Sequence, residues 1–312
     1  IHAAVPFTWL DPPEGAYSSG RRSALAVWLT QPRHPLTARV IVNRLWLHHF
    51  GEGILSTVDD FGWAGEDPTH RALLDWLAVE LEDGGWSLKQ LHRRIVMSAA
   101  YRQQSSDGHP DAVRAEQVDP QNRLLWRQNL RRLEAEPLRD SILAVSGGLL
   151  TNMFGRPIPV ATRSDGEVVV NDGKLPQRRS VYLRNTRSAP LSILQLFDQP
   201  DIETNCARRS QSTVPLQALS LMNSDIVSNA AIGFASVAMK EAPATPVSWA
   251  FQAAFSRRPD NTELSTLKEF VAKQTQHWLA QVETQRIWEY GYCGSAADEQ
   301  KRLTFTPFPH FG

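Results

Sequence analysis

The sequence is poor in cysteine. Its 312 residues include only Cys206 and Cys293, too few for a four-cysteine zinc site, and neither lies in the CxxCH motif that attaches haem. The two thiols either form one disulfide or stay free and buried. A disulfide would close a loop of about 90 residues and contribute about 4 kcal/mol in the chain-entropy model. We expect no metal site and no cofactor in this chain.

Net charge and long apolar runs are lacking too. The 33 Lys and Arg residues balance the 33 Asp and Glu residues, so no net field attracts nucleic acid or an anionic membrane. No run approaches the roughly 20 apolar residues of a membrane-spanning helix. The first residues show neither Met nor a signal-peptide pattern, and we expect an excised piece of a longer chain.

Common catalytic motifs are missing as well. The sequence contains no GxSxG, HExxH, GxGxxG or Walker loop, which argues against the serine, zinc and nucleotide chemistries that these motifs serve. A site built from carboxylates and arginines needs none of them. Whether the chain is an enzyme therefore stays open at this level.

The residues that are present predict a folded, helical protein. Apolar residues make up 42% and charged residues 21% of the chain, as in ordinary globular proteins. Apolar side chains recur at helical spacing, Asp67-Pro68 and Ser87 offer helix starts, and glycines offer helix ends. The predicted helices are residues 23–30, 37–50, 68–83, 87–101, 131–146, 190–197, 215–234, 247–255 and a last one from 260 onward.

Residues 155–187 differ in composition from their surroundings. Pro, Gly and β-branched residues predict two short strands at 168–170 and 180–183, joined by 171–173. The predicted fold class is mainly α: an irregular multi-helix globular domain with a small β-hairpin insertion and an irregular C-terminal tail. Its predicted parts are an irregular lead-in at 1–20, a helical domain at 21–285 with a linker at 241–246, and a junction at 286–312 to a missing C-terminal region.

Polar residues interrupt the otherwise apolar helix at 37–50. Asn43, Arg44 and His48 either line a pocket, with Arg44 binding a ligand and His48 as a catalytic candidate, or Asn43 and Arg44 hold the loop at 52–60. Buried polar groups need partners in either case. His48 and His49 point about 100° apart on a helix, so they are poorly placed to bind one metal.

Carboxylates provide the other catalytic candidates. Asp60 either caps a turn or supplies an acid or a calcium ligand. Glu136 and Asp140 lie one helical turn apart. Glu136 with either Asp140 or Asp60 could flank a sugar bond as in a glycosidase. Arg132 and Arg139 lie beside them, and a neighbouring arginine favours the ionised carboxylate, whereas a proton donor must be protonated. A network of ion pairs that joins helices is the alternative.

A second polar cluster precedes the helix predicted at 215–234. Arg208 and Arg209, with the free N–H groups of a helix start and the side chain of Gln217, could hold a sulfate, phosphate or carboxylate. Capping and Arg–Asp pairing is the alternative. Ten tryptophans are also present; aromatic faces suit sugar rings, although Trp28, Trp46 and Trp76 follow the apolar pattern of core residues.

Several stretches together resemble a known family, the planctomycete surface-protein domain of unknown function. The resemblance rests on motifs spread over residues 20–230. They are RSALAVWLT at 22–30, ARVIVNRLW at 38–46, FGEGI at 50–54, DDFG at 59–62, LLDWLA at 73–78, RRLEAE at 131–136, RD at 139–140, FD at 197–198 and STVPLQAL at 212–219.

The resemblance implies a cellular location but no particular reaction. Such domains lie near the C-terminus of large secreted proteins that often carry a cytochrome c-like domain, so it implies a periplasmic, cell-surface or extracellular location. It also implies that the partners are other domains of the same surface chain, and a glycan-binding region often follows.

Three hypotheses result. The first is a secreted helical module that organises a larger surface protein and binds glycan or anionic ligands. The second is a carbohydrate-active enzyme with a carboxylate–arginine site. The third is an accessory module of a haem-bearing electron-transfer protein, whose haem would belong to another segment. Polysaccharide is the expected external partner, and nucleic acid is not expected.

Overall fold

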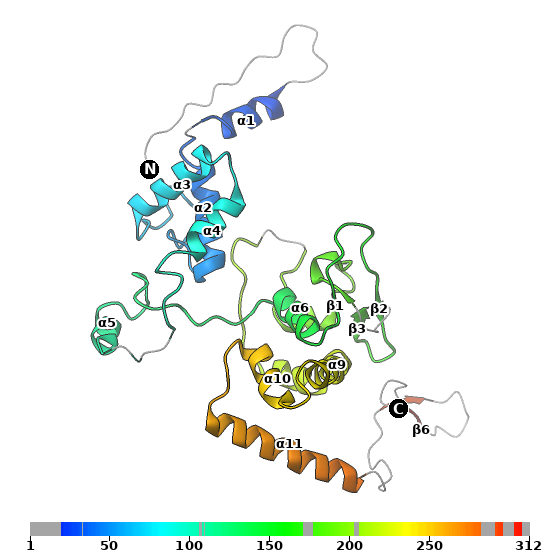
Figure 1. Ribbon diagram of the computed structural model, residues 1–312. Coiled ribbons are helices and arrows are strands. Elements are labelled where there is room, and N and C mark those ends of the chain that lie inside the picture. Colours follow the sequence, from blue (N-terminus) through cyan, green and yellow to red (C-terminus); the bar gives the residue numbers. More distant parts are fainter. Residues whose placement is uncertain are drawn as a thin grey trace. The chain divides into compact units, whose positions relative to one another are not determined.

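The computed structural model describes residues 20–32, 34–105, 108, 110–170, 177–202, 206–281, 291–295 and 303–307, with side chains as far as Trp278. It divides into two compact units, Ile1–Arg132 and Leu133–Gly312, and each is described by itself (Figure 1). The structure thus has two units where the sequence predicted one helical domain at 21–285. Each unit has a hydrophobic core of its own.

The first unit contains five helices among its described residues. Figure 1 shows them in blue to green as α1 (Arg21–Leu29), α2 (Thr37–Phe50), α3 (Arg71–Asp83), α4 (Leu88–Val96) and α5 (Ala112–Val118). The first four correspond to predicted helices, and α2 has the predicted bounds. It ends at Gly51 with a φ of 86°, a backbone conformation that glycine adopts without strain.

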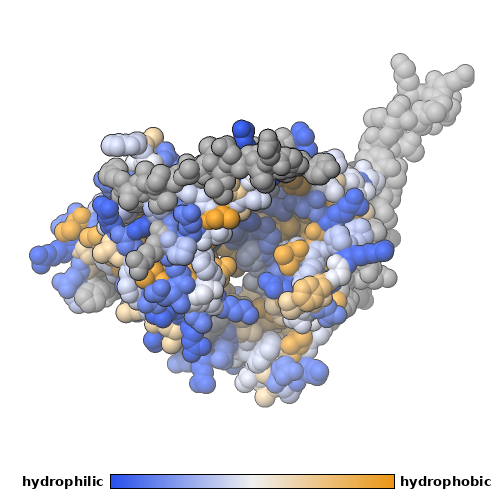
Figure 2. Space-filling model, turned by 90° about the horizontal axis from the view of Figure 1, so that it is seen from above, coloured by the Kyte–Doolittle hydropathy of each residue, from blue (hydrophilic) through white to orange (hydrophobic). Residues whose placement is uncertain are grey.

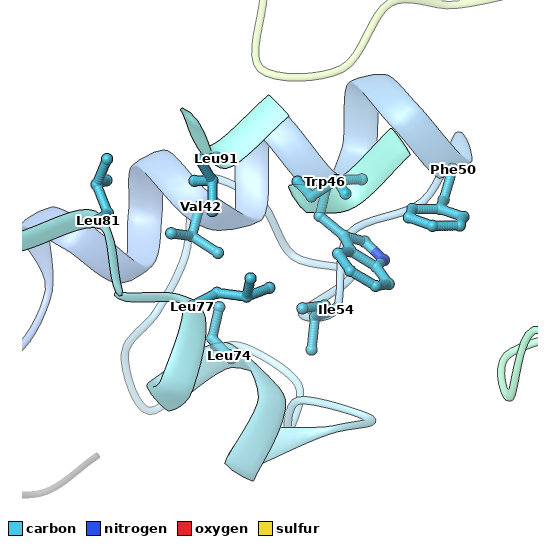
Figure 3. Close-up of a cluster of buried hydrophobic side chains, with 9 residues drawn as sticks. Val42, Trp46, Phe50, Ile54, Leu74, Leu77, Leu81 and Leu91 are labelled. Carbon is cyan, nitrogen blue, oxygen red and sulfur yellow. The ribbon is translucent and has the colours of Figure 1, made fainter. Parts of the chain in front are cut away.

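The core of the first unit lies between α2, α3 and α4. Figure 3 shows apolar side chains of the three helices pointing toward one another, with Ile54 added from the loop that follows α2. The rings of Trp46 and Phe50 stack at 4.2 Å, and Val42 and Leu74 are fully buried. Burial of a Leu-sized side chain contributes about 1.5–3 kcal/mol, so this cluster stabilises the three-helix arrangement.

The second unit is built around α6 (Ala135–Val145). Its other helices are α7 (Ser192–Leu196), α8 (Pro215–Asn223), α9 (Asp225–Glu241), α10 (Pro246–Phe255) and α11 (Asn261–Gln281). Its core contains Ala135, Val170, Leu191, Leu194 and Phe197. Pro137 lies in the first turn of α6, where its missing N–H costs nothing. The helix predicted at 215–234 is broken at Ser224, whose ψ of 145° is extended.

Short strands confirm a small β insertion, but their pairing differs from the prediction. The hairpin joins β2 (Val160–Thr162) to β3 (Val168–Val170) in antiparallel register. The second predicted strand is wrong: Ser180–Tyr182 forms a 3-10 helix. β4 (Gln177–Arg178) instead pairs in parallel with β1 (Leu149–Leu150). The predicted joining turn at 171–173 lies outside the described residues.

Two further predictions are corrected. Asp67-Pro68 does not start α3, which begins at Arg71, because Thr69 donates through its backbone N and its Oγ1 to the Ile54 carbonyl at 2.8 and 3.1 Å. The predicted linker at 241–246 is a tight turn between α9 and α10, since the Thr245 N–H donates to the Ala242 carbonyl at 3.0 Å. The ring centroids of Phe234 and Trp249 on these helices lie 6.0 Å apart.

The ends of the chain were predicted to be irregular. Residues 1–19 of the lead-in lie outside the described residues. In the tail, β5 (Gly291–Ser295) and β6 (Leu303–Pro307) pair as an antiparallel hairpin. The mainly α fold class is confirmed, with its small β-hairpin insertion.

Hydrophobic residues on the surface lie in small groups among hydrophilic ones on the face that Figure 2 shows. Exposed apolar side chains occur on α8, α9 and α10, among them Met222, Ile232 and Phe255. Among the described residues, no helix combines the length and the hydrophobicity needed to cross a membrane.

Candidate functional site

The catalytic candidates lie in two separate units. His48 and Asp60 belong to the first, whereas Glu136 and Asp140 belong to the second. The predicted binding residues are divided in the same way, with Arg44 and Arg132 in the first unit and Arg139, Arg208, Arg209 and Gln217 in the second. A site must therefore be sought within each unit.

Asp60 caps a turn. Its Oδ1 accepts a hydrogen bond of 2.7 Å from the Gly62 N–H, and its carbonyl accepts one of 2.9 Å from the Thr57 hydroxyl. Such an aspartate hydrogen bond to the backbone two residues on is a common turn device. These contacts give Asp60 a structural role in the turn.

The polar residues of α2 have different surroundings. Asn43 is fully buried and exchanges two hydrogen bonds with the Leu55 backbone: its Nδ2 donates to the carbonyl at 2.8 Å, and its Oδ1 accepts from the N–H at 2.9 Å. It therefore holds the loop after α2, as one sequence interpretation had it. Arg44 and His48 are exposed.

His49 pairs with a histidine that the sequence did not suggest. Its Nε2 lies 2.7 Å from Nδ1 of His92 on α4, a direct hydrogen-bond distance. Two nitrogens bound to one zinc at about 2.0–2.1 Å each must lie further apart than this in tetrahedral geometry. Burial lowers the pKa of His49, and the charges of His92, Arg131 and His48 lower it further.

Arg139 and Asp140 join α6 to the segment around Ser180. The fully buried Arg139 donates to the Arg178 carbonyl at 3.1 Å, to Ser180 Oγ at 3.2 Å and to Gln177 Oε1 at 2.5 Å. Asp140 accepts from the Ser180 N–H and hydroxyl, both at 2.7 Å. Burial lowers the pKa of Arg139 to about 10, although the negative charge of Asp140 acts to raise it. Both side chains are engaged in holding the fold.

Glu136 forms an ion pair with Arg209. Two hydrogen bonds of 2.6 and 3.2 Å link the guanidinium to the carboxylate, and Glu134 approaches the same guanidinium at 2.9 Å. Burial lowers the pKa of Arg209, but the hydrogen bond to Glu136 and the charges of Glu136 and Glu134 outweigh burial and raise it. Charge-assisted hydrogen bonds of this kind are strong, and they make Glu136 a structural link between α6 and the segment before α8.

The anion site predicted before α8 is occupied by protein groups. Asp198 accepts from the N–H and hydroxyl of Ser212 at 2.8 and 2.7 Å. The buried Gln217 donates to the Leu196 carbonyl at 3.0 Å and the Ser212 carbonyl at 3.2 Å. Arg209 is neutralised by two glutamates, and Arg208 is exposed. These contacts match the capping part of the alternative, whereas Arg209 pairs with glutamates and not with an aspartate.

The remaining candidates carry little chemistry of their own. Cys206 is an exposed free thiol, so it is neither buried nor in a disulfide here, and the side chain of Cys293 lies outside the described residues. Arg132 is half-buried at the end of the first unit. Within the described residues, no group of three or more His, Cys, Asp or Glu side chains could hold a metal ion.

One cleft of small-molecule size lies in the first unit, where the sequence named no candidate. It has a volume of about 610 Å³ and is lined by residues of α2 and α3 and by Thr30, Gln31, Pro32 and His34. Sites for small molecules measure about 300–1,000 Å³. Its lining includes charged, histidine and tryptophan side chains, namely His34, Arg39, Asp75, Glu82, Asp83 and Trp86.

Polar contacts fix the two sides of this cleft. Arg39 Nε donates to Asp75 Oδ1 at 2.6 Å, and Arg39 Nη1 donates to the Pro35 carbonyl at 2.6 Å. Trp86 follows the end of α3, where its N–H donates to the Leu81 carbonyl at 2.8 Å. The sequence held one signal for this site: Glu82 and Asp83 lie in the last turn of a helix, where the helix dipole disfavours acids.

The fold and contacts define a mainly α-helical domain protein of two units in which Asp60, Glu136 and Asp140 are held in structural contacts, whereas His48 is exposed. It belongs to the family described as PSD1, protein of unknown function (DUF1553), whose model matches residues 21–271. The match begins at α1, ends within α11 and includes helices of both units. No curated protein and no solved structure matches the chain.

Proposed function

We propose that this chain is a non-catalytic helical module of a larger secreted protein, where it binds glycan. The observation that carries the proposal is that the predicted acids are already bound to protein groups. Asp60 is bound to Gly62, Glu136 to Arg209 and Asp140 to Ser180. A glycosidase needs two carboxylates about 5–9.5 Å apart across one sugar bond, and these contacts serve the fold instead.

A binding role agrees with the rest of the structure. The cleft of the first unit has the volume of a small-molecule site, and it combines an exposed tryptophan face with polar side chains, the pairing that sugar rings use. Secretion and the company of other surface domains rest on the resemblance of the sequence, and they are part of the proposal.

A carbohydrate-active enzyme is the competing function. It would need Glu136 or Asp140 to leave its present partner when substrate binds, and the four hydrogen bonds that hold these two carboxylates oppose this. An electron-transfer role would need a haem-bearing segment, and this sequence has no CxxCH motif, so we do not propose it for this chain.

The test is retention of the whole chain on insoluble neutral, amine-bearing and sulfated polysaccharides, with an assay for newly released reducing ends. We expect retention on at least one polysaccharide and no release. Release that is abolished in Glu136→Gln and Asp140→Asn variants with native circular dichroism would establish the enzyme instead. Absence of retention on every polysaccharide would remove glycan binding.

A further inference from the structure

We propose that an arginine-rich face of the second unit binds the acidic groups of a glycan, sulfate or carboxylate, with Phe154 against a sugar ring. The inference rests on the proposed glycan-binding function and names its site and ligand class. Three features of residues 141–197 carry it: a surplus of arginines, a loop that is fixed beside them, and an exposed aromatic ring on that loop.

Positive charge is concentrated in residues 141–197. This stretch contains seven Lys or Arg residues and three Asp or Glu residues, a net charge of +4 in a chain whose total is zero. Two of these residues, Asp172 and Lys174, lie outside the described residues, and their charges cancel. A local surplus of this kind attracts anionic ligands although the whole chain is neutral.

Two of the arginines are already engaged. Arg163 pairs with Glu167 and Asp225 at 2.8 and 2.9 Å, and Arg187 has a contact of its own. Neither is counted as available for a ligand. The arginines that remain in the stretch are Arg156, Arg178, Arg179 and Arg184.

Three of the remaining arginines can reach a ligand. Arg156 and Arg184 are exposed, and neither forms an ion pair within the described part of the chain. The Arg179 side chain is 58% exposed, and its Nε lies 3.6 Å from Asp140 Oδ2, a long contact that solvent weakens. The planar fork of an arginine matches two oxygens of a sulfate or carboxylate, so these side chains suit acidic groups.

Backbone contacts bring the segments of Arg156 and Arg184 together. The Ile158 N–H donates to the Tyr182 carbonyl at 2.8 Å, and the Arg184 N–H donates to the Ile158 carbonyl at 2.8 Å. Ile158 and Leu183 form a parallel bridge, and both pack against the core of the unit. The arginines therefore lie on two adjacent segments at the edge of that core.

Arg178 fixes the loop at 152–156 beside these segments. Its guanidinium donates to the Asn152 carbonyl at 3.1 Å, to the Arg156 carbonyl at 3.4 Å and to the Phe154 carbonyl. It also lies over the Tyr182 ring, 4.1 Å from the centroid. Within the described residues, Arg178 is bound by carbonyls and not by a carboxylate, so its charge adds to the surplus. A loop that is ordered in advance costs less entropy when a ligand binds.

Phe154 supplies an indication of a ligand that does not depend on charge. Its side chain is 76% exposed, and its backbone φ of 63° is left-handed, a conformation that is uncommon and costly for a bulky residue. The hydrogen bond from Arg178 to the Phe154 carbonyl helps to hold it. An exposed aromatic ring held in this way, two residues before Arg156, offers a face on which a sugar ring can stack.

An acidic glycan satisfies both features at once. Its sulfate or carboxylate groups pair with the guanidinium groups, and its rings provide faces for the aromatic side chain. Phospholipids and nucleic acids also offer anionic groups to arginines, and the experiment includes both as competitors for this assignment.

The experiment is calorimetric titration of the whole chain with a β-1,4-linked glucose pentasaccharide that carries 6-O-sulfate groups. The corresponding glucuronic acid pentasaccharide, the unmodified pentasaccharide, a short DNA duplex and vesicles of phosphatidylcholine with phosphatidylglycerol are titrated in parallel. We expect both acidic sugars to bind at least tenfold more tightly than the unmodified one. Their affinity should fall as salt rises, because salt screens the charges.

Three variants and two matched controls locate the site. Arg156→Gln, Arg184→Gln and Phe154→Ala should each weaken binding of the sulfated sugar about three- to tenfold, because one charged hydrogen-bond donor or the stacking face is lost. Arg258→Gln and Phe270→Ala change an exposed arginine and an exposed phenylalanine of the same unit outside residues 141–197, and they should bind like the native chain. Circular dichroism and Tm check the fold of all five.

Each other outcome overturns a stated part. Equal affinity for the three sugars would refute the role of the acidic groups, and tighter binding of DNA or vesicles at the same salt would refute a glycan as the partner of this face. Equal effects of variants and controls would place the ligand elsewhere. If the acidic sugars do not bind while the chain is retained on a neutral or amine-bearing polysaccharide, only this inference fails; if retention is absent as well, the glycan-binding function fails with it.

Discussion

Glu136 and Arg209, 73 residues apart in the sequence, meet through two hydrogen bonds of 2.6 and 3.2 Å. The contact ties α6 to the segment before α8 and engages one of the predicted catalytic residues, Glu136. About a quarter of the Glu136 side chain and a third of Arg209 stay exposed, so solvent weakens the pair. Its role is best tested as a contribution to stability.

Replacing Glu136 by Gln should lower the free energy of unfolding by about 1 kcal/mol, because a charged hydrogen bond becomes a neutral one in a partly exposed site. Urea denaturation at pH 7 measures the change. Glu269→Gln is the matched control, since Glu269 pairs with Lys273 one helical turn away and both are well exposed. It should cost less than about 0.5 kcal/mol. Equal costs would contradict a structural role for Glu136.

Arg139 should be far less replaceable. Methionine at this position would fill much of the space but leave the Arg178 carbonyl, Gln177 Oε1 and the Ser180 hydroxyl without their donor. We expect a loss of about 3 kcal/mol or more, and a smaller loss for Arg139→Lys, which keeps the charge but not the planar fork.

The same denaturation experiment provides the control for Arg139. Arg156→Met removes an exposed arginine of the same unit and should leave stability within about 0.5 kcal/mol. Hydrogen exchange of the Ser180 amide, which donates to Asp140, should quicken in Arg139→Met only. Unchanged exchange there would show that Arg139 does not hold this segment.

Local patterns predicted the helices well and the long-range contacts poorly. The bounds of α2 follow from apolar residues on nearly every face and a glycine at the end. Ser180–Tyr182 has the composition of a strand, but Asp140, 40 residues earlier, takes the Ser180 N–H. The spacing of residues along the sequence does not indicate that Asp140 is the partner of Ser180.

The cleft of the first unit was equally hard to predict from the sequence. Its residues are spread from His34 to Trp86 and converge only when α2 and α3 pack. The conspicuous cluster at 131–140 was predicted to be either a site or an ion-pair network, and it forms ion pairs. The cluster at 208–217 was predicted to be either an anion site or a capping and pairing arrangement, and it forms capping hydrogen bonds. Dense charge in a sequence marks buried pairing as readily as function.

Asn43 makes a prediction about the loop after α2. Its side chain satisfies both backbone groups of Leu55 in a fully buried position. Asn43→Ala should cost about 2–3 kcal/mol, because a buried N–H and a buried carbonyl lose their partners. Asn223→Ala removes an exposed helical asparagine whose Nδ2 donates to the Leu219 carbonyl, and should cost much less. Thermal denaturation of the two variants compares them, and similar Tm values would refute the role of Asn43.

Glu263 should titrate at unusually low pH. Arg257 donates to both of its carboxylate oxygens at 2.6 and 2.8 Å, and the Asp260 N–H donates at 2.9 Å. The hydrogen bonds from Arg257, then that from Asp260, lower the pKa of Glu263 from 4.5 to about 2. Since the folded pKa is depressed, the stabilisation is present above pH 4.5 and is lost as pH falls through about 2.

Carboxyl ¹³C NMR titration measures this midpoint directly. Arg257→Met should move it up toward 4.5, because the hydrogen bonds from Arg257 are the largest cause of the low pKa of Glu263. Arg258→Met, at an exposed neighbouring arginine, should leave it unchanged. A midpoint near 4.5 in the native chain would show that the carboxylate is not held by Arg257 in solution.

The pairing of His49 with His92 predicts a dependence of stability on mildly acidic pH. Burial lowers the pKa of His49 below 6.5, and the charges of His92, Arg131 and His48 lower it further. The Tyr101 ring lies edge-on to the His49 ring, with 5.5 Å between the ring centroids. Between the lowered value and 6.5 the unfolded chain binds more protons than the folded one. The free energy of unfolding should therefore be highest above pH 6.5 and fall as pH decreases from there.

Denaturation at a series of pH values from 7.5 to 5 tests this dependence. His49→Gln should flatten the decline, because the group that resists protonation in the folded state is gone. His277→Gln replaces an exposed histidine on α11 and should preserve the native profile. The geometry also requires His92→Gln to shift the His49 resonances in NMR, since the two ring nitrogens are 2.7 Å apart. A native pH profile in His49→Gln together with unshifted resonances in His92→Gln would mean that the pair does not form in solution.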